Sequence, residues 1–266
     1  GVDISRYKNI PVPTSYMAVE SKYNFVGGYE NDTKGGLLHV ANHHVSPGKK
    51  QWTWGNSDFG QAWDRNLTDK DGPYIELMCG VFTDNQPDFS WIMPYEERTF
   101  NQYFMPYRDL GVVKNASKDA MVNLEFEDRK ATVKVYTTGI CPKLSIRLEA
   151  RGIVYLVEII DSSPKVSFEK TVIVEGDLKP EDFLLSVNDQ NGKLLVDFRP
   201  ESIIHKPIPE AAKPAKLPNE IDSIEQLFLT GLHLEQYRHA TFNPVDYYLE
   251  ALRRDPADVR CNNAMG

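Results

Sequence analysis

The residues best suited to chemistry lie in one stretch, residues 51–76, which reads QWTWGNSDFGQAWDRNLTDKDGPYIE. It contains three of the chain's four tryptophans, Trp52, Trp54 and Trp63. The flat face of an indole stacks well on the C–H face of a pyranose ring. Acids, an amide and an arginine in the same stretch would supply the fixed donors and acceptors that sugar hydroxyls need. The stretch therefore predicts a carbohydrate site, with the three indoles as stacking surfaces.

The polar side chains of the stretch have expected roles in such a site. We expect Asp58 and Asp64 to serve as catalytic partners or as ligands of sugar hydroxyls, and Gln61 and Arg65 to bind hydroxyls or a carboxylate. Tryptophan is highly buried on average whatever its role, so the alternative is a tryptophan-rich core with the charged residues in water.

Glu76 is the candidate acid or base. It interrupts an apolar segment, Tyr74–Met78, where a carboxylate is costly unless it is hydrogen-bonded or functional. A carboxylate beside a sugar ring can transfer protons as a general acid or base. The alternative is a strand residue whose side chain reaches solvent at the end of a sheet.

Three histidines, His39, His43 and His44, raise the question of a metal. The chain has no HxH or HExxH spacing, and on a strand the adjacent pair would point to opposite faces. P-loop, GxGxxG and GxSxG motifs are also missing from the sequence. We therefore expect neither a metal nor a cofactor.

The composition of the chain indicates which classes of binding partner to expect. The 266 residues carry a net charge of -8 with a pI near 5.3 and no cluster of lysine or arginine, so we expect no nucleic-acid partner. No apolar run approaches the ~20 residues of a membrane helix, and we expect no membrane association. The three cysteines, Cys79, Cys141 and Cys261, are widely spaced and odd in number. They favour a reducing compartment such as the cytoplasm, or an export route independent of disulfides.

The elements that would position the site are strands. In residues 1–112 the pattern predicts antiparallel β-structure with two long loops, 43–73 and 84–97. The segments rich in β-branched and aromatic residues are 12–19, 23–29, 37–42, 74–83 and 98–107.

Residues 117–200 alternate apolar and polar residues cleanly, which predicts about seven short strands in a small β-sandwich of immunoglobulin-like architecture. Asn191-Gly192 marks a hairpin. The segment holds neither tryptophan nor histidine, so we assign it no chemistry.

Residues 201–222 are proline-rich and predict an extended linker. Residues 223–266 predict a helical hairpin that resembles the start of a tetratricopeptide repeat, with Gly231 at the tight contact between helices followed by Tyr248, Ala251 and Pro256. Repeat arrays need neighbours to bury their faces, so we expect the native protein to continue past Gly266.

Several motifs of the first part resemble a known superfamily. The run Gly72–Leu77, then Gln86-Pro87-Asp88, then Pro94–Phe100 and Tyr103, looks like the end of a galactose-mutarotase-like supersandwich domain. More closely, the stretch from His43-His44 through WTWG, FGQAWDRN, DGPYIELM, TDNQPDFSW and PYE resembles a bacterial family of uncharacterised supersandwich domains joined to tetratricopeptide repeats. The resemblance implies a carbohydrate-binding or carbohydrate-active protein. It adds His43 and His44 to the expected substrate-binding residues.

Together these patterns predict a mainly β protein in four parts: 1–115, the C-terminal part of a mutarotase-like supersandwich; 116–200, a β-sandwich; 201–222, a linker; and 223–266, the start of helical repeats. The leading hypothesis is carbohydrate recognition, extended to processing of the glycoside hydrolase or epimerase type if Glu76 acts as acid or base. The alternative is a non-enzymatic scaffold that binds a protein partner through the repeats.

Overall fold

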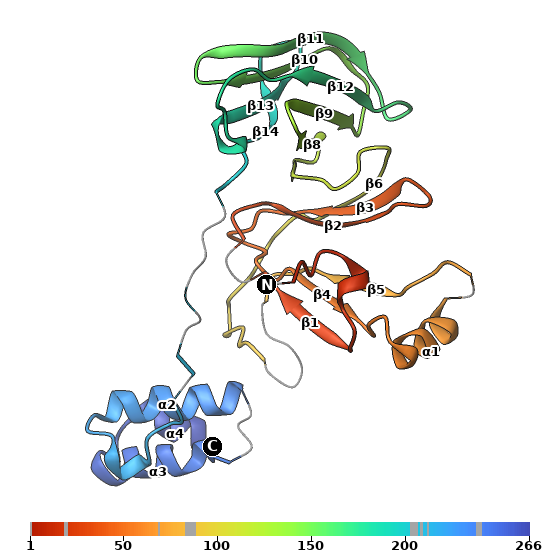
Figure 1. Cartoon of the computed structure of the whole chain (residues 1–266). Helices are drawn as coiled ribbons and strands as arrows, with labels where there is room; N and C mark the ends of the chain where they lie inside the picture. Colours follow the sequence, from red (N-terminus) through yellow and green to blue (C-terminus); the bar gives the residue numbers. More distant parts are fainter. Residues whose placement is uncertain are drawn as a thin grey trace. The chain divides into compact units, whose positions relative to one another are not determined.

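The computed structural model of the protein describes residues 2–18, 21–68, 70–82, 89–202, 207, 210–211, 213–237 and 241–266. It is mainly β, with several antiparallel sheets followed by a short helical segment, as the sequence predicts (Figure 1). The chain divides into two compact units, residues 1–83 with 98–204 and residues 84–97 with 205–266. None of the described helices has the length and apolar character needed to cross a membrane.

The six strands between residues 14 and 108 form two small antiparallel sheets, each of three strands. One has the order β1–β4–β5, with β1 at Thr14–Met17, β4 at Lys50–Thr53 and β5 at Ile75–Met78. The other has the order β2–β3–β6, with β2 at Phe25–Glu30, β3 at Gly35–Val40 and β6 at Tyr103–Arg108. All of these strands except β4 overlap a segment that the sequence predicts to be a strand. A short 3-10 helix, η1, precedes them at Tyr7–Asn9.

The prediction of one long loop over residues 43–73 is wrong, because that segment contains both β4 and a helix, α1, at Asp58–Leu67. The helix has ten residues, fewer than the 11-residue window in which a helical period is sought, although Phe59, Trp63 and Leu67 recur along it at four-residue intervals. A helix of this length is marginal alone, and contacts with the rest of the fold must stabilise it. In the other predicted loop, residues 83–88 lie outside the described residues, and 89–97 form neither helix nor strand.

The predicted sandwich region forms two four-stranded antiparallel sheets, with orders β12–β9–β8–β7 and β11–β10–β13–β14. Eight strands are present where the alternation predicts about seven. Their bounds are β7 Asn115–Ala116, β8 Ala120–Glu127, β9 Lys130–Thr137, β10 Cys141–Ala150, β11 Ile153–Ser162, β12 Phe168–Ile173, β13 Phe183–Asn188 and β14 Leu194–Phe198. A 3-10 helix, η2, precedes β13 at Pro180–Asp182.

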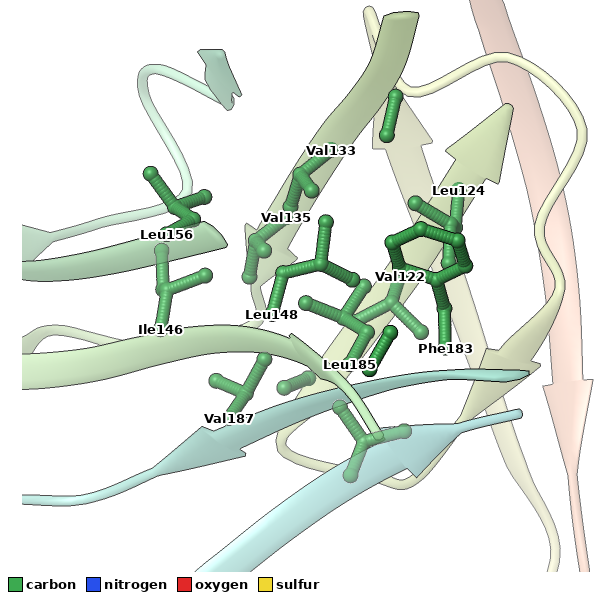
Figure 2. Packing of buried hydrophobic residues seen from close by; sticks show 14 of the residues in the cluster. Val122, Leu124, Val133, Val135, Ile146, Leu148, Leu156, Phe183, Leu185 and Val187 are labelled. Atoms are coloured by element: carbon green, nitrogen blue, oxygen red, sulfur yellow. The ribbon is translucent and has the colours of Figure 1, made fainter. Parts of the chain in front are cut away.

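Alternate residues of these strands build one hydrophobic core. Figure 2 shows Val122 and Val135 from one sheet pointing toward Leu148 and Leu185 from the other, and all four are fully buried. The predicted hairpin joins β13 to β14, where Gly192 takes a positive φ of 80°. Period-two patterning thus identifies the two inner faces because side chains alternate across a strand.

The small sheets and the sandwich belong to the same compact unit. A second buried cluster joins the sheet β2–β3–β6 to the sandwich, and it contains Leu38 of β3, Tyr107 of β6, Leu110, and Met121 and Tyr136 of the sandwich. The side-chain amide of Asn123 also donates a hydrogen bond to the Leu110 carbonyl, 2.9 Å away. The sandwich is therefore a packing support for the sheet β2–β3–β6.

The C-terminal segment contains three helices, α2 at Ile224–Gln236, α3 at Pro244–Arg254 and α4 at Val259–Met265, after a 3-10 helix, η3, at Pro218–Glu220. Ser223 caps α2 and Asn243 caps α3, each accepting a hydrogen bond from a backbone N–H of the first turn. Gly231 lies at a tight contact between helices, as predicted, and its neighbour there is Tyr248, whose Cε1 would lie 2.5 Å from a Cβ at position 231. Tyr237 and Leu249 are exposed. Of the predicted linker, residues 203–206, 208–209 and 212 lie outside the described residues.

Candidate functional site

The three tryptophans of the stretch 51–76 lie together, as the sequence-based hypothesis requires. The rings of Trp54 and Trp63 are stacked, with centroids 4.4 Å apart and an angle of 7° between their planes. Trp52 and Phe59 each meet Trp54 edge to face, at 4.5 and 5.9 Å. We call Trp52, Trp54, Phe59 and Trp63 the aromatic cluster. Its outer members stay accessible, since Trp63 is 38% exposed and Phe59 is 55% exposed.

Two elements hold the aromatic cluster. Trp52 comes from β4 and Trp54 from the residues that follow it, whereas Phe59 and Trp63 stand four residues apart on one face of α1. The backbone between them is fixed to the start of the chain: Asn56 N–H donates to the Ile10 carbonyl at 2.8 Å, and the Tyr7 hydroxyl donates to the Gly55 carbonyl at 2.8 Å. The cluster is therefore a rigid surface feature.

Asp64 lies on a different part of α1 and is 8% exposed. Its Oδ1 accepts the backbone N–H of Tyr74 at 3.0 Å, and its Oδ2 lies 3.0 Å from the Tyr7 hydroxyl. Burial, together with this hydrogen bond, raises the pKa of Tyr7 to about 12. The carboxylate therefore ties α1 both to η1 and to the residue before β5.

We predict that Asp64→Ala destabilises the protein by about 1–3 kcal/mol, because the part-buried N–H of Tyr74 loses its acceptor and the Tyr7 hydroxyl keeps only the Gly55 carbonyl. Asp58→Ala is the matched control, since Asp58 is an exposed residue in the first turn of the same helix. Its replacement should lower the free energy of unfolding by less than about 1 kcal/mol. Urea unfolding followed by tryptophan fluorescence measures both changes. Equal effects from the two substitutions would contradict the anchoring role of Asp64.

Glu76 stands beside the aromatic cluster. It is the cross-strand partner of Trp52 in the β4–β5 pairing, and partners in register project to the same face of a sheet. Its Oε1 accepts the hydroxyl of Tyr74 at 2.9 Å, and this hydrogen bond raises the pKa of Tyr74. Glu76 is partly buried, so a carboxylate with a phenol partner lies opposite Trp52 in the β4–β5 pairing.

The other predicted polar residues of the stretch lie apart from the indoles. Gln61, Asp64 and Arg65 line a shallow pocket of about 390 Å³ with Tyr7, and the side-chain amide of Gln61 donates to the Asn56 carbonyl at 3.1 Å. None of the three tryptophans lines that pocket. The structure therefore separates these candidate ligands from the stacking surfaces.

His43 and His44 lie elsewhere. They belong to a turn after β3, in which the Val45 N–H donates to the Asn42 carbonyl at 3.0 Å, rather than to a strand. The expectation that they point to opposite faces is wrong for that reason, and their ring centroids are 3.9 Å apart. They line a pocket of about 660 Å³ to which none of the tryptophans contributes.

Sequence reasoning missed three residues of the site. Tyr7, Phe59 and Tyr74 hold Asp64, extend the aromatic cluster and bind Glu76, respectively. Tyr74 stands two residues before Glu76, a spacing that places both side chains on one side of a strand, and this signal could have identified it. Tyr7 has no such signal because its partners are some fifty residues away along the chain.

Comparison with known protein families gives two matches. Residues 1–109 match the family described as Domain of unknown function (DUF5107), and residues 115–198 match the second domain of YphG-like proteins. These matches support the expected relation to a bacterial family of domains of unknown function. Among solved structures, a TPR-domain containing protein from Parabacteroides distasonis is 24% identical over 38% of this chain, with a TM-score of 0.33. The match covers 17% of that chain, so this protein chain spans only a small part of its length.

Proposed function

We propose that the first unit of this protein recognises a carbohydrate at the aromatic cluster. The observation that supports this most is the stack of Trp63 on Trp54, which presents an indole to solvent beside a second tryptophan and a carboxylate. An indole buried for packing alone would have both faces covered, whereas Trp63 remains 38% exposed. A rigid, amphipathic ring with an accessible face is the part that a sugar-binding surface needs.

We also propose the finer architecture that the resemblance implies. Residues 1–115 would be part of a galactose-mutarotase-like supersandwich, residues 116–200 an immunoglobulin-like sandwich and residues 223–266 the start of tetratricopeptide repeats. The two three-stranded sheets, the paired four-stranded sheets and the glycine contact between α2 and α3 support these assignments in turn.

Recognition is better supported than processing. The hydrogen-bond partner of Glu76 in the described part of the chain is a tyrosine, and a hydrolase would need a second carboxylate at ~5 Å or ~6.5–9.5 Å from it. If the protein does process a sugar, by hydrolysis or epimerisation, Glu76 is the residue that would carry the proton, with Tyr74 fixing the carboxylate.

The test is a glycan-binding screen with Trp63→Ala. We predict that this substitution weakens binding at least tenfold, which corresponds to about 1.4 kcal/mol, because the accessible stacking face is lost. Trp91→Ala is the matched control, since Trp91 is 51% exposed in the other unit and meets only the edge-to-face ring of Phe89 among the described aromatic pairs. Calorimetry with the glycan identified by the screen measures both affinities.

Glu76→Gln separates binding from chemistry. The amide keeps the size of the side chain and removes its charge, so a binding protein should retain the glycan and an enzyme should lose turnover. If no glycan binds the wild-type protein, or if Trp63→Ala and Trp91→Ala bind it equally, the carbohydrate proposal is refuted.

A second candidate function is supported by the helical unit, which leaves large apolar side chains exposed on all three helices. These are Leu229 of α2, Leu249 of α3 and Val259 of α4. Such residues suit a protein-interaction scaffold acting through the repeats. The glycan screen distinguishes this function from carbohydrate recognition, because a scaffold protein would bind no glycan. The substitution Leu249→Glu should weaken the binding of a protein partner to a scaffold.

A further inference from the structure

A pocket of about 460 Å³ in the first unit is separate from the proposed carbohydrate site. Its volume is within the usual range for small-molecule sites. Most of its lining comes from residues 5–8, from strand β2, from the paired strands β4 and β5, and from residues 112–113 after β6. None of the tryptophans contributes to it, so it is a second concave surface on the same unit.

The pocket lies on the face of the β1–β4–β5 sheet that is opposite the Trp52 side. Gln51 pairs with Leu77 across β4 and β5, and Trp52 pairs with Glu76 in the next register position. Because neighbouring residues of a strand point to opposite faces, Gln51 and Leu77 share one face and Trp52 and Glu76 share the other. Gln51 and Leu77 line the pocket, so a ligand here would not contact the proposed sugar-binding surface.

The free edge of β2 supplies the pocket with backbone donors and acceptors. This strand lies at the edge of its sheet and pairs with β3 alone. The Asn24 carbonyl accepts the Ala41 N–H at 2.8 Å, and hydrogen-bonded and non-hydrogen-bonded pairs alternate along an antiparallel ladder. Gly27, three residues further on, therefore belongs to a non-hydrogen-bonded pair and directs its N–H and C=O away from β3. It is exposed and lines the pocket, and its lack of a side chain leaves both groups open to a ligand.

The amide side chain of Gln51 is a second accessible polar group. It forms no hydrogen bond with the residues that the structure describes, and it is only partly buried, so a ligand in the pocket can reach it. An amide of this kind offers two N–H donors and a carbonyl acceptor. Gln51 and Gly27 together can therefore bond the oxygen atoms of a ligand.

Two cationic side chains, Arg6 and Lys8, line the pocket, and none of its lining residues is acidic. The Lys8 ammonium has neither a hydrogen bond nor an ion pair within the described part of the chain. Arg6 has a single ion-pair contact there, 3.8 Å from its Nε to Oδ2 of Asp3, and both of these side chains are exposed. Such a contact contributes little, and the Asp3 carboxylate accepts its hydrogen bonds from Ser5 instead. Both cations are therefore available to an anionic ligand.

Apolar side chains form another part of the lining. Ile75 is 42% exposed, and Phe25 and Leu77 are partly buried, so the pocket offers them as accessible apolar surface. We propose that this pocket binds an organic carboxylate with an apolar body. The carboxylate is bonded by Arg6 and Lys8, since a guanidinium can bind both carboxylate oxygens at once, and the body lies on Ile75 and Leu77. This proposal does not depend on carbohydrate recognition at the aromatic cluster.

The experiment titrates the whole chain with phenylacetate and hexanoate, with 2-phenylethanol and hexanol as neutral counterparts, and with acetate as an anion without an apolar body. Calorimetry measures the affinities. We expect each apolar carboxylate to bind at least fivefold more tightly than its alcohol and than acetate, and we expect its advantage over the alcohol to shrink in high salt. In NMR spectra the backbone amide of Gly27 and the side-chain amide of Gln51 should shift on binding, whereas the amide of Gly152 in the sandwich should not.

Replacing both cations tests the anion preference. Arg6→Gln with Lys8→Gln should make phenylacetate bind no more tightly than 2-phenylethanol. The fold should remain, because both residues are exposed and their side chains make no hydrogen bond in the described part of the chain. Lys143→Gln with Lys165→Gln is the matched control, since it removes the same charge from exposed residues of the same unit that do not line the pocket. Thermal unfolding checks that both variants are folded.

A second substitution tests the apolar contact. Ile75→Ala should weaken the binding of phenylacetate and of 2-phenylethanol alike, by at least threefold, because the apolar surface under both ligands is reduced. Ile159→Ala on β11 is the control, since Ile159 is 67% exposed and does not line the pocket. Trp63→Ala should leave carboxylate binding intact, so failure of the aromatic cluster and failure of this pocket are distinguishable.

Three results would overturn the proposal. Alcohols that bind the wild type as tightly as the carboxylates would remove the anion preference. Acetate that binds as tightly as phenylacetate and hexanoate would remove the role of the apolar surface. Carboxylate binding that is missing from the wild type, or that the cation substitutions and Ile75→Ala leave unchanged, would show that the pocket is not the site.

Discussion

Gly60→Ala is expected to destabilise the first unit by about 3 kcal/mol or more and to disperse the aromatic cluster. Gly60 is a buried residue within α1, and a Cβ on it would lie 1.8 Å from the Gly55 carbonyl oxygen and 2.7 Å from that of Trp54. Both are backbone atoms, so no side chain can rotate away. Alanine would favour the helix by up to about 1 kcal/mol, but overpacking against backbone costs about 1–3 kcal/mol or more. The clash therefore outweighs the gain in helix propensity, and the substitution lowers the stability of the protein.

Gly80→Ala is the matched control for Gly60→Ala. It follows β5, has nothing within 4 Å of an added Cβ and has no positive φ, so alanine should be neutral or stabilise by about 0.4–1 kcal/mol. Thermal unfolding measures both variants, and near-ultraviolet circular dichroism reports the stacking of Trp54 on Trp63. A Gly60→Ala protein with wild-type stability would show that α1 does not pack on residues 54–55 as described.

His39→Phe is expected to stabilise the protein by on the order of 1–3 kcal/mol at neutral pH and more strongly in acid. His39 lies on β3, is 3% exposed, and both of its ring nitrogens lack a hydrogen-bond partner among the described residues. Its ring lies 5.1 Å from that of Phe104, and phenylalanine has a similar shape and no polar atom to desolvate. The substitution therefore removes two buried nitrogens that have no hydrogen-bond partner among the described residues, and it keeps the aromatic contact with Phe104.

The pH dependence of this effect follows from the pKa of His39. Burial, and secondarily the charge of Lys49, lowers that pKa in the folded protein. As pH falls through about 6.5, the unfolded chain takes up a proton first, so the free energy of unfolding decreases until the folded pKa is also passed. His39→Phe should remove this loss, and denaturant unfolding between pH 5 and 8 would show a flatter curve.

His44→Phe is the matched control for replacing an imidazole by a phenyl ring, because His44 is exposed and its substitution should change the free energy of unfolding at neutral pH by less than about 0.5 kcal/mol. Lys49 remains in the His39→Phe protein, where its ammonium donates to Ser21 Oγ at 3.1 Å and to the Tyr23 carbonyl. A pH slope equal to that of the wild type in His39→Phe would show that the acid sensitivity of the unit comes from another group.

The sandwich illustrates what short-range pattern predicts well. Along β8, β9 and β10 the residues in the core are those that alternation places on one face, such as Val122, Val133 and Ile146. The hairpin at Asn191-Gly192 is equally local, since it depends on the positive φ of one residue. Helix α1 is different, because its stability depends on contacts with residues far along the chain, such as Tyr7.

Periodicity and residue type act over a few neighbours, so they predict the β-rich first part and the helical end. Which candidate residues lie side by side is set by the tertiary structure. It placed Trp52 beside Glu76 through strand pairing, turned Asp64 inward to Tyr7 and Tyr74, and put His43 and His44 in a separate pocket. These outcomes depend on strand register and on the packing of α1, which are set by contacts between residues distant in sequence and so are invisible to any local pattern.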